Sequence, residues 1–331
     1  MGDDYRLAGW VTLDLRMLAV LLVFSLAVAG LVGAPGRPGY VASKHGVIGL
    51  TRTAAIAAAA AAIGPRLTAA DAVVKTKINH SVCKWCYPKV SLDDLCTAGK
   101  QFGLQSVELL EPQDFATVKQ HGLHCAMVSF PQRNGIGTIT KAFNRLEHHD
   151  TLVELYTERI PQCAAAGFRQ LICFSGNRAG LDDETGLKNC SVGLKRLLPL
   201  AEKHGVTLVM ELLNSRVNHK DYQCDKSGWG IALCKELGSE RFKLLYDIYH
   251  MQIMEGDVIA TIQRDHQYFA HYHTGGVPGR NEIDDTQELN YPAIMRAIRA
   301  TGYQGYVGQE FIPKREDKIA SLKQGVQICT V

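Results

Sequence analysis

Residues 242–250, FKLLYDIYH, contain the pattern on which the fold prediction depends. A short apolar run of this kind, ending in polar side chains, is typical of a buried strand. Seven more such runs occur in the chain, and each ends in polar residues or glycine. The eight predicted strands lie at 78–85, 106–111, 124–130, 170–176, 207–214, 242–250, 268–276 and 305–311.

Helical stretches separate most of these strands. They include 91–103, 152–168, 192–205 and 291–302, several of which end in glycine, the residue that helix C-termini favour. Alternating strands and helices within residues 78–331 predict an α/β fold, a (β/α)8 TIM barrel. An open, doubly wound sheet is the alternative, but it usually has fewer strands and needs a glycine-rich phosphate loop.

The last four predicted strands end in ionisable side chains, namely Glu211, Asp247, His273 and Glu310. Chemistry in this barrel takes place at the C-terminal ends of the strands, so these side chains should meet at one mouth. A buried carboxylate is costly unless it is paired or bound to a cation. Pairing with a lysine or arginine explains any one of them, but four together predict a site for Mn²⁺, Mg²⁺ or Co²⁺, with Zn²⁺ also compatible.

Side-chain alternation separates the two histidines of the seventh predicted strand. His271 and His273 share one face because side chains repeat every second residue along a strand. His273 lies nearer the C-terminal end and is the predicted ligand. His271 is predicted to be a hydrogen-bonded core histidine one layer deeper.

Four segments carry a family resemblance: MELLNSR (210–216), RFKLLYDIYHMQIMEGD (241–257), HYHTGGVPGR (271–280) and GYQGYVGQEFIP (302–313). Through them, residues 78–331 resemble the xylose-isomerase-like sugar isomerase and epimerase barrels, and among these the hydroxypyruvate isomerases. The resemblance implies that the four strand-end residues bind a metal ion and that Glu211 and Glu310 also move protons. It further implies isomerisation of hydroxypyruvate to tartronate semialdehyde (2-hydroxy-3-oxopropanoate) through an enediolate.

His273 departs from this pattern, because glutamine is common at that position in the hydroxypyruvate branch and histidine is typical of the ketose epimerase branch. A ketose 3-epimerase or an inosose-type isomerase is therefore one alternative, and a non-catalytic sugar-binding barrel is another. The related branch that repairs abasic DNA would need more histidines at strand ends and a positive face.

The carboxylate of hydroxypyruvate would need a cation in the site. Arg216, just after the fifth predicted strand, is the first candidate, followed by Arg280 and Lys84. His250, three residues after Asp247, is predicted to hydrogen-bond a substrate oxygen. A solvent-exposed loop histidine is the alternative for His250, and a surface residue without a specific contact is the alternative for each of the three candidate cations.

Residues 1–77 differ in composition from the rest and are predicted to form a separate N-terminal extension. Within it, the apolar stretch 17–36 is long enough to cross a bilayer or to direct export. Residues 27–55 resemble the part of short-chain dehydrogenases that carries a Tyr-x-x-x-Lys motif, here Tyr40 and Lys44. Ala27 stands where that family has its serine, and no glycine-rich loop precedes it, so neither NAD binding nor oxidoreductase activity is expected.

Composition and charge exclude several classes of protein. The 331 residues are 46% hydrophobic and 21% charged, unlike disordered or collagen-like chains. Residues 1–77 hold eight basic and four acidic residues, a net charge of +4, so residues 78–331 carry −1 of the chain's total of +3. A barrel without positive charge argues against a nucleic-acid partner. The partner expected instead is a small hydroxy-carbonyl substrate, and a homo-oligomer is compatible with the sequence.

Cysteine usage predicts the compartment. Ten cysteines are too dilute for a disulfide framework, and several, such as Cys125 and Cys173, lie in apolar runs. They are predicted to be buried thiols in a reducing, cytoplasmic environment, with export or membrane anchoring through 17–36 as the alternative. The close pair Cys83 and Cys86 lacks the second pair or context that a zinc or redox role requires.

Overall fold

The structure is a computed structural model that describes residues 77–331. The apolar stretch 17–36 and the dehydrogenase-like stretch 27–55 lie outside the described residues. In the described part of the chain, no helix combines the length and the apolar character needed to cross a membrane.

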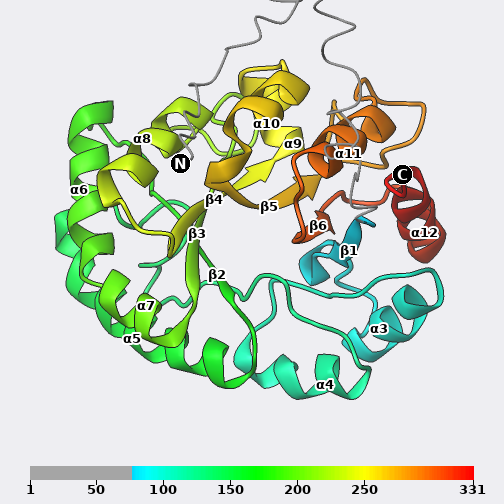
Figure 1. The fold of residues 1–331 in the computed structure, drawn as a ribbon, viewed down its shortest axis with the longest axis horizontal. Helices are drawn as coiled ribbons and strands as arrows, with labels where there is room; N and C mark the ends of the chain where they lie inside the picture. Colours follow the sequence, from blue (N-terminus) through cyan, green and yellow to red (C-terminus); the bar gives the residue numbers. More distant parts are fainter. Residues whose placement is uncertain (1–76) are drawn as a thin grey trace, which may run out of the picture. The chain divides into compact units, whose positions relative to one another are not determined.

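Six parallel strands form one curved sheet in the order β1-β6-β5-β4-β3-β2 (Figure 1). The strands are β1 (Asn79–Val82), β2 (Gln170–Cys173), β3 (Thr207–Glu211), β4 (Phe242–Asp247), β5 (Phe269–Thr274) and β6 (Tyr306–Gln309). The register places Asp247 opposite His273 and His273 opposite Gly308. Two predicted strand-end residues, Asp247 and His273, are therefore direct neighbours across the sheet.

Two irregular segments complete the wall between β1 and β2. Single parallel bridges join Cys83 to Glu108, Leu110 to Val128 and Val128 to Leu171, so the eight predicted runs form a closed ring. The barrel prediction is confirmed, but the runs 106–111 and 124–130 are not regular strands. Leu109 takes a left-handed conformation (φ 57°), which interrupts the first run, and Pro131, which has no N–H to donate, follows the second.

Helices cover the outside of the strands (Figure 1). The α-helices are α3 (Leu92–Gln101), α4 (Phe115–Gln120), α5 (His149–Ala165), α6 (Asp183–Lys195), α7 (Leu198–His204), α8 (Ser227–Leu237), α9 (Ile248–Met254), α10 (Val258–Asp265), α11 (Tyr291–Ala300) and α12 (Lys318–Ile328). Short 3-10 helices are η2 (Lys84–Cys86), η3 (Pro112–Asp114), η4 (Leu146–His148) and η5 (His266–Tyr268).

Helix α11 shows how the sequence produces these elements. The Asn290 side chain accepts a hydrogen bond from the Ala293 N–H, and Pro292 occupies the first turn, where its missing N–H costs nothing. Ile294 and Ile298, four residues apart, are buried, whereas Arg296 is exposed. The helix therefore packs one apolar face inward.

The predicted helical stretch 192–205 is divided in the structure. Its first part belongs to α6, which ends at Lys195, and its second part is α7. Pro199 lies in the first turn of α7, because proline cannot donate the hydrogen bond that would continue α6. Gly205 then ends α7 in the left-handed conformation, as the glycine there predicts.

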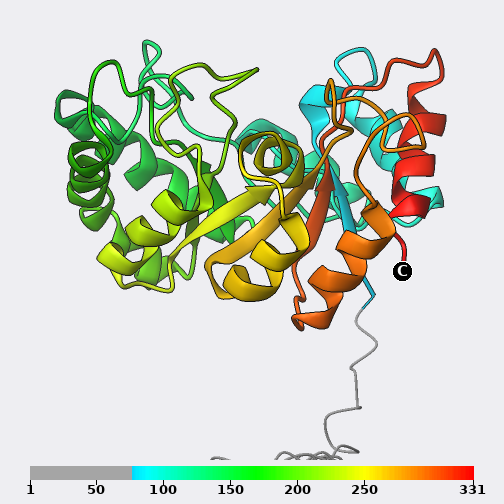
Figure 2. The same ribbon diagram turned by 90° about the horizontal axis from the view of Figure 1, so that it is seen from above.

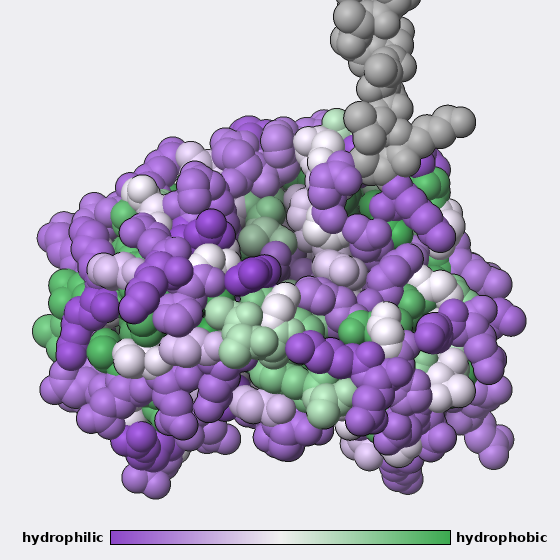
Figure 3. Space-filling view, turned by 60° about the horizontal axis from the view of Figure 1, so that its bottom comes forward, coloured by the Kyte–Doolittle hydropathy of each residue, from purple (hydrophilic) through white to green (hydrophobic). Residues whose placement is uncertain are grey.

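Apolar side chains of the strands and of the surrounding helices form one core cluster. All ten cysteines are free and buried, which confirms the prediction for Cys125 and Cys173. The face drawn in Figure 3 is mainly hydrophilic, with smaller hydrophobic areas between the polar ones. The long connecting loops gather on the side where the strands end (Figure 2). That side is where the sequence predicts the site.

Candidate active site

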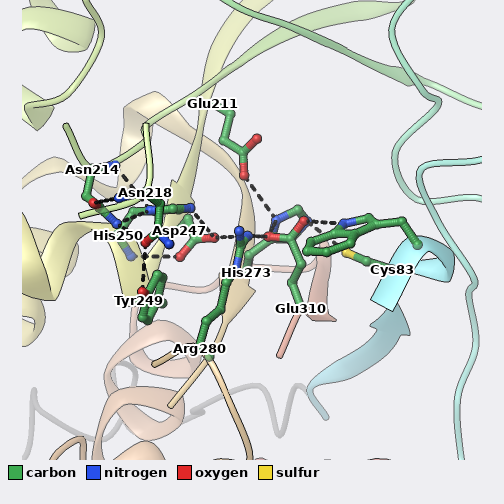
Figure 4. Close-up of polar contacts among 12 residues, drawn as sticks. Cys83, Glu211, Asn214, Asn218, Asp247, Tyr249, His250, His273, Arg280 and Glu310 are labelled. Carbon is green, nitrogen blue, oxygen red and sulfur yellow. Dashed lines mark hydrogen bonds and ion pairs between the residues drawn. The ribbon is translucent and has the colours of Figure 1, made fainter. Parts of the chain in front are cut away.

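Four predicted residues converge at the C-terminal ends of neighbouring strands. Glu211 and Asp247 are the last residues of β3 and β4, His273 is the fifth residue of β5, and Glu310 directly follows β6. Each offers one ligand atom, and these atoms all lie within 4.8 Å of one another. Figure 4 shows the four side chains directed toward one another. All four are buried, with exposed fractions of 4% or less.

Two atoms in this cluster lack hydrogen-bond partners. His273 Nδ1 lies 2.8 Å from Glu310 Oε2 and 3.4 Å from Glu211 Oε1. Neither of these two contacts is a hydrogen bond. His273 Nδ1 and Glu211 Oε1 are both buried, and neither has a hydrogen-bond partner among the described residues. An unpaired buried polar atom costs about 1–3 kcal/mol. A divalent cation would satisfy both atoms, so the donor set fits a metal ion.

The carboxylates of Glu211, Asp247 and Glu310 shift one another's pKa values. Burial raises the pKa of Asp247 to about 8, with Glu310 and Glu211 adding to the shift and Arg280 opposing it. Burial and the charge of Glu310 also raise the pKa of Glu211. For Glu310, burial is outweighed by Arg280 and His273, which lower its pKa well below the usual value. The pKa values of Glu211 and Glu310 are thus shifted in opposite directions, a pattern found at acid/base sites.

In the absence of a metal ion, the surroundings of His273 favour the charged form of its ring. Burial opposes that charge, but Cys83, Glu310 and a hydrogen bond to Glu108 together raise the pKa of His273 well above its ordinary value. A proton on this ring therefore provides part of the positive charge that the carboxylates require. A divalent cation would replace that proton, because a ring nitrogen that binds metal cannot also carry hydrogen.

Arg280, the second candidate for binding a substrate carboxylate, lies inside the cluster. Its Nη2 pairs with Glu310 Oε2 and lies 3.3 Å from Asp247 Oδ2. The guanidinium also lies over two aromatic rings, 5.2 Å from the centre of Trp85 and 5.6 Å from that of Tyr249. Ion pairs and rings together fix this side chain beside the candidate ligands.

His250 is buried in the first turn of α9, so the alternative of a solvent-exposed loop histidine is wrong. Its Nδ1 accepts a hydrogen bond from the Asn214 backbone N–H at 3.1 Å. Burial, with Arg280 nearby, lowers the pKa of His250 well below its ordinary value. The ring is therefore neutral with its proton on Nε2. This atom lies 3.7 Å from Asp247 Oδ2 and has no hydrogen-bond partner within residues 77–331.

The other two predicted substrate ligands lie apart from the cluster. Arg216 is exposed, and its Nη1 donates to the Ile253 carbonyl oxygen at 2.9 Å. Lys84 donates from Nζ to the Tyr87 carbonyl oxygen at 3.2 Å. Neither belongs to the cavity described below, so the structure does not bring these two residues together with the other candidates.

Trp85 belongs to the site although its sequence context does not single it out. It follows β1 within η2, and its Nε1–H donates to Glu310 Oε1 at 2.8 Å. The ring remains 43% exposed. The available signal was a large aromatic residue at the end of the predicted strand 78–85.

The strand-end pattern also fails to predict Glu108, a buried carboxylate that contacts two histidines of β5. Its Oε1 lies 2.8 Å from His271 Nε2 and 2.7 Å from His273 Nε2. This contact confirms His271 as a hydrogen-bonded core histidine. Glu108 stands in the middle of its run rather than at the end, so a search of strand ends overlooks it. The available signal was a lone acid among apolar residues in SVELL.

A cavity of about 370 Å³ adjoins the cluster. Its lining includes the charged and polar side chains of Glu211, His219, Arg280 and Glu310. The remaining wall is largely apolar and is formed by Leu109, Phe130, Ile139, Ile172, Phe174 and Leu213, with Trp85 and Ser129 completing the lining. The lining therefore combines polar groups that can bind oxygen atoms with a larger apolar surface.

Known proteins similar to this chain include curated isomerases. A 2-oxo-tetronate isomerase from Cupriavidus necator is 39% identical over 114 residues, which cover 34% of this chain and 43% of that protein. A hydroxypyruvate isomerase from Escherichia coli K12 is 28% identical over 154 residues, covering 45% of this chain and 58% of that protein. In both cases the matched part is less than two thirds of the relative's length.

Solved structures share the fold at lower identity. An AP endonuclease of family 2 from Brucella melitensis superposes with a TM-score of 0.65 and 23% identity, covering 76% of this chain and 99% of that one. A D-psicose 3-epimerase from Clostridium cellulolyticum H10, solved with D-tagatose, gives a TM-score of 0.61 at 15% identity, covering 77% and 100%. At these identities the likeness concerns the barrel alone.

Residues 101–328 match a family described as the xylose isomerase-like TIM barrel. The match begins well after residues 27–55, so it gives no support to the dehydrogenase-like resemblance of that stretch. It covers most of the chain and agrees with the closed ring of parallel strands, so this chain belongs to the xylose isomerase-like TIM barrel family.

Proposed function

We propose that the protein is a metal-dependent isomerase that interconverts hydroxypyruvate and tartronate semialdehyde. The observation that carries the proposal is the convergence of Glu211, Asp247, His273 and Glu310, with two unpaired atoms facing one another. The names of the similar isomerases support the reaction class.

The same four residues would hold the divalent ion, which when bound would polarise the hydroxyl and carbonyl oxygens of the substrate. Isomerisation then needs a proton taken from C3 of hydroxypyruvate and a proton delivered to C2, while the hydroxyl proton of the oxygen on C3 passes to the oxygen on C2. Glu310, kept ionised by Arg280, is suited to accept a proton. Glu211, whose pKa burial raises, is suited to hold and deliver one.

Binding of the substrate carboxylate is assigned to Arg280, because this buried guanidinium lines the cavity beside Glu211 and Glu310. His250 is assigned to a substrate oxygen through its unpartnered Nε2–H. Arg216 and Lys84 are less suited, because their charged groups bond to backbone carbonyls elsewhere.

The test uses the purified full chain with Mn²⁺ or Mg²⁺. We expect turnover of hydroxypyruvate that EDTA abolishes and that Mn²⁺ restores. Glu211→Gln and Glu310→Gln should each lower kcat by at least about 100-fold, the usual range for lost acid/base groups. Glu154→Gln is the matched control, because its carboxylate is exposed and pairs with Arg133. Full activity in either active-site variant would overturn the assignment.

A larger substrate is the second candidate, and the cavity favours it. About 370 Å³ with an apolar wall is more space than a three-carbon acid fills. A 2-oxo-tetronate, as named for the Cupriavidus necator relative, or a ketose undergoing 3-epimerisation would occupy more of it. Comparison of kcat/KM for hydroxypyruvate, a 2-oxo-tetronate and several ketoses separates these substrates, and binding without turnover would indicate a sugar-binding barrel instead.

A further inference from the structure

Glu108 connects the two histidines of β5 to the opposite, irregular part of the barrel wall. It is fully buried, and its Oε1 lies within 2.8 Å of Nε2 of both His271 and His273. The two rings are nearly perpendicular, at 86° with centres 5.0 Å apart, so one oxygen meets both N–H groups from different directions. The cost of burying this carboxylate is offset by two charge-assisted hydrogen bonds.

The position of the Glu108 carboxylate determines which nitrogen of His273 is free. An ionised carboxylate only accepts hydrogen bonds, so the His273 Nε2 facing it carries a proton. The other nitrogen, Nδ1, faces the carboxylates of Glu211 and Glu310. An imidazole that binds a cation does so through the nitrogen without hydrogen, and a carboxylate behind the ring strengthens that binding.

We propose that Glu108 is a positioning residue that presents His273 Nδ1 to a divalent cation and thereby sets the affinity of the site. His271 holds the same oxygen from a second direction and keeps Glu108 from turning away. The inference rests on the proposed function, because it presumes that the four-residue cluster binds a metal ion.

Gly308 of β6 provides a second, independent observation that Glu108 and His273 are tightly packed. A methyl group at position 308 would lie 2.6 Å from Glu108 Oε1 and 2.8 Å from His273 Cδ2. Both distances are too short for real contacts, so only glycine leaves room for the pair. Cys83 Sγ, 3.6 Å from His273 Nε2 and 3.7 Å from Glu108 Oε1, closes the remaining side.

Glu108 and the two histidines could instead form a metal site of their own, and the experiment must separate that alternative from a positioning role. Ligand atoms of Glu108, His271 and His273 also lie within 4.8 Å of one another and could hold a second ion. His273 Nε2 cannot both donate its proton to Glu108 and bind metal. The proposal therefore requires one ion per chain, whereas the second site requires two.

The experiment measures Mn²⁺ affinity and stoichiometry by titration calorimetry on the full chain. Glu108→Gln should bind one ion with about 10- to 100-fold lower affinity, the usual effect of losing a carboxylate behind a metal-binding histidine. Glu111→Gln is the matched control, because this acid lies in the same region and pairs with Arg159 at the surface. Its affinity should stay within about twofold of wild type.

Nuclear magnetic resonance of the Mg²⁺-loaded protein with labelled histidine supplies a readout that a general loss of stability would not produce. Wild type should show a downfield Nε2–H signal from His273, and Glu108→Gln should shift it upfield or remove it. If Glu108→Gln fails to fold, Gly308→Ala, which keeps every charge but displaces the pair, should show the same loss of affinity.

Three results would overturn the inference. Wild-type affinity in Glu108→Gln, or two ions per wild-type chain, would overturn it while leaving the proposed function standing. A wild-type chain that binds no divalent ion would overturn both, so the two failures are distinguishable.

Discussion

The Trp85 indole places its only hydrogen-bond donor on Glu310, one of the two glutamates assigned to proton transfer. Because the acceptor is charged and buried, loss of this bond should cost about 1.5–3 kcal/mol. We expect Trp85→Phe, which keeps the ring over Arg280, to lower kcat/KM by about 10- to 100-fold. Steady-state kinetics on hydroxypyruvate provides the measurement.

Trp229→Phe is the control for this prediction. Its Nε1–H donates to the Asp183 carbonyl oxygen at 3.0 Å, away from the cavity. That variant should keep wild-type kinetics. Equal activity of Trp85→Phe and Trp229→Phe would show that the indole hydrogen bond does not contribute to the reaction.

The strand-end residues could be predicted because their position and chemistry coincide. Asp247 and Glu310 each follow an apolar run, and a carboxylate there requires a cation or a charged partner. Glu108 and Trp85 could not be found in this way. The lone acid in SVELL and the aromatic residue in CKWC are weak signals, because the role of Glu108 depends on the approach of β5 and that of Trp85 on the fold of η2, which the local sequence does not specify.

At the scale of elements, Asp247 has two roles that substitution can separate. Besides facing the candidate metal site, its Oδ1 accepts a hydrogen bond from the His250 N–H and caps α9. Asp247→Asn should keep the cap, whereas Asp247→Ala loses it and should be less stable than the asparagine variant by about 1 kcal/mol. Both should bind Mn²⁺ at least about tenfold more weakly, because a ligand charge is gone. Urea unfolding and calorimetric titration measure the two effects.

Asp182 provides the matching control, because it caps α6 at the surface by accepting from the Thr185 N–H at 2.8 Å. Its asparagine and alanine variants should show the same difference in stability with unchanged Mn²⁺ affinity. A loss of metal affinity in Asp182→Asn would contradict the separation of the two roles.

Elements with strong periodic patterns were predictable, and the irregular wall was not. The run 242–250 contains β4 and the start of α9, and 291–302 contains α11. The runs 106–111 and 124–130 are also rich in apolar residues, but only isolated bridges join them to their neighbours, and a left-handed Leu109 interrupts the first of them. Apolar character alone does not reveal whether a backbone ladder is continuous.

For the whole molecule, the raised pKa of Asp247 links stability to pH. A pKa of about 8 in the folded state, against about 3.9 in the unfolded chain, means that the folded state binds more protons between these values. Asp247 therefore lowers the free energy of unfolding as pH rises from 4 to 8. In EDTA, wild type should lose more stability than Asp247→Asn between pH 5 and pH 8, as measured by urea unfolding.

Added Mn²⁺ should reverse that loss, because a bound cation stabilises the ionised carboxylates and acts only on the folded state. At about 100 times its Kd, a ligand contributes about 2.7 kcal/mol. The increase in melting temperature on adding Mn²⁺ should therefore be larger at pH 8 than at pH 6. An equal increase at both values would contradict a role for Asp247 in binding the ion.

The regular and irregular parts of the barrel wall contribute different residues to the site. The proposed ligands come from the continuous ladder of β3 to β6. Four residues that line the cavity, namely Leu109, Ser129, Phe130 and Ile139, come instead from segments with little or no strand pairing. Residues in loosely paired segments tolerate change better than residues in a ladder. New substrate preferences should therefore evolve through the irregular wall while the reacting centre stays intact, and this wall is where a designer would begin.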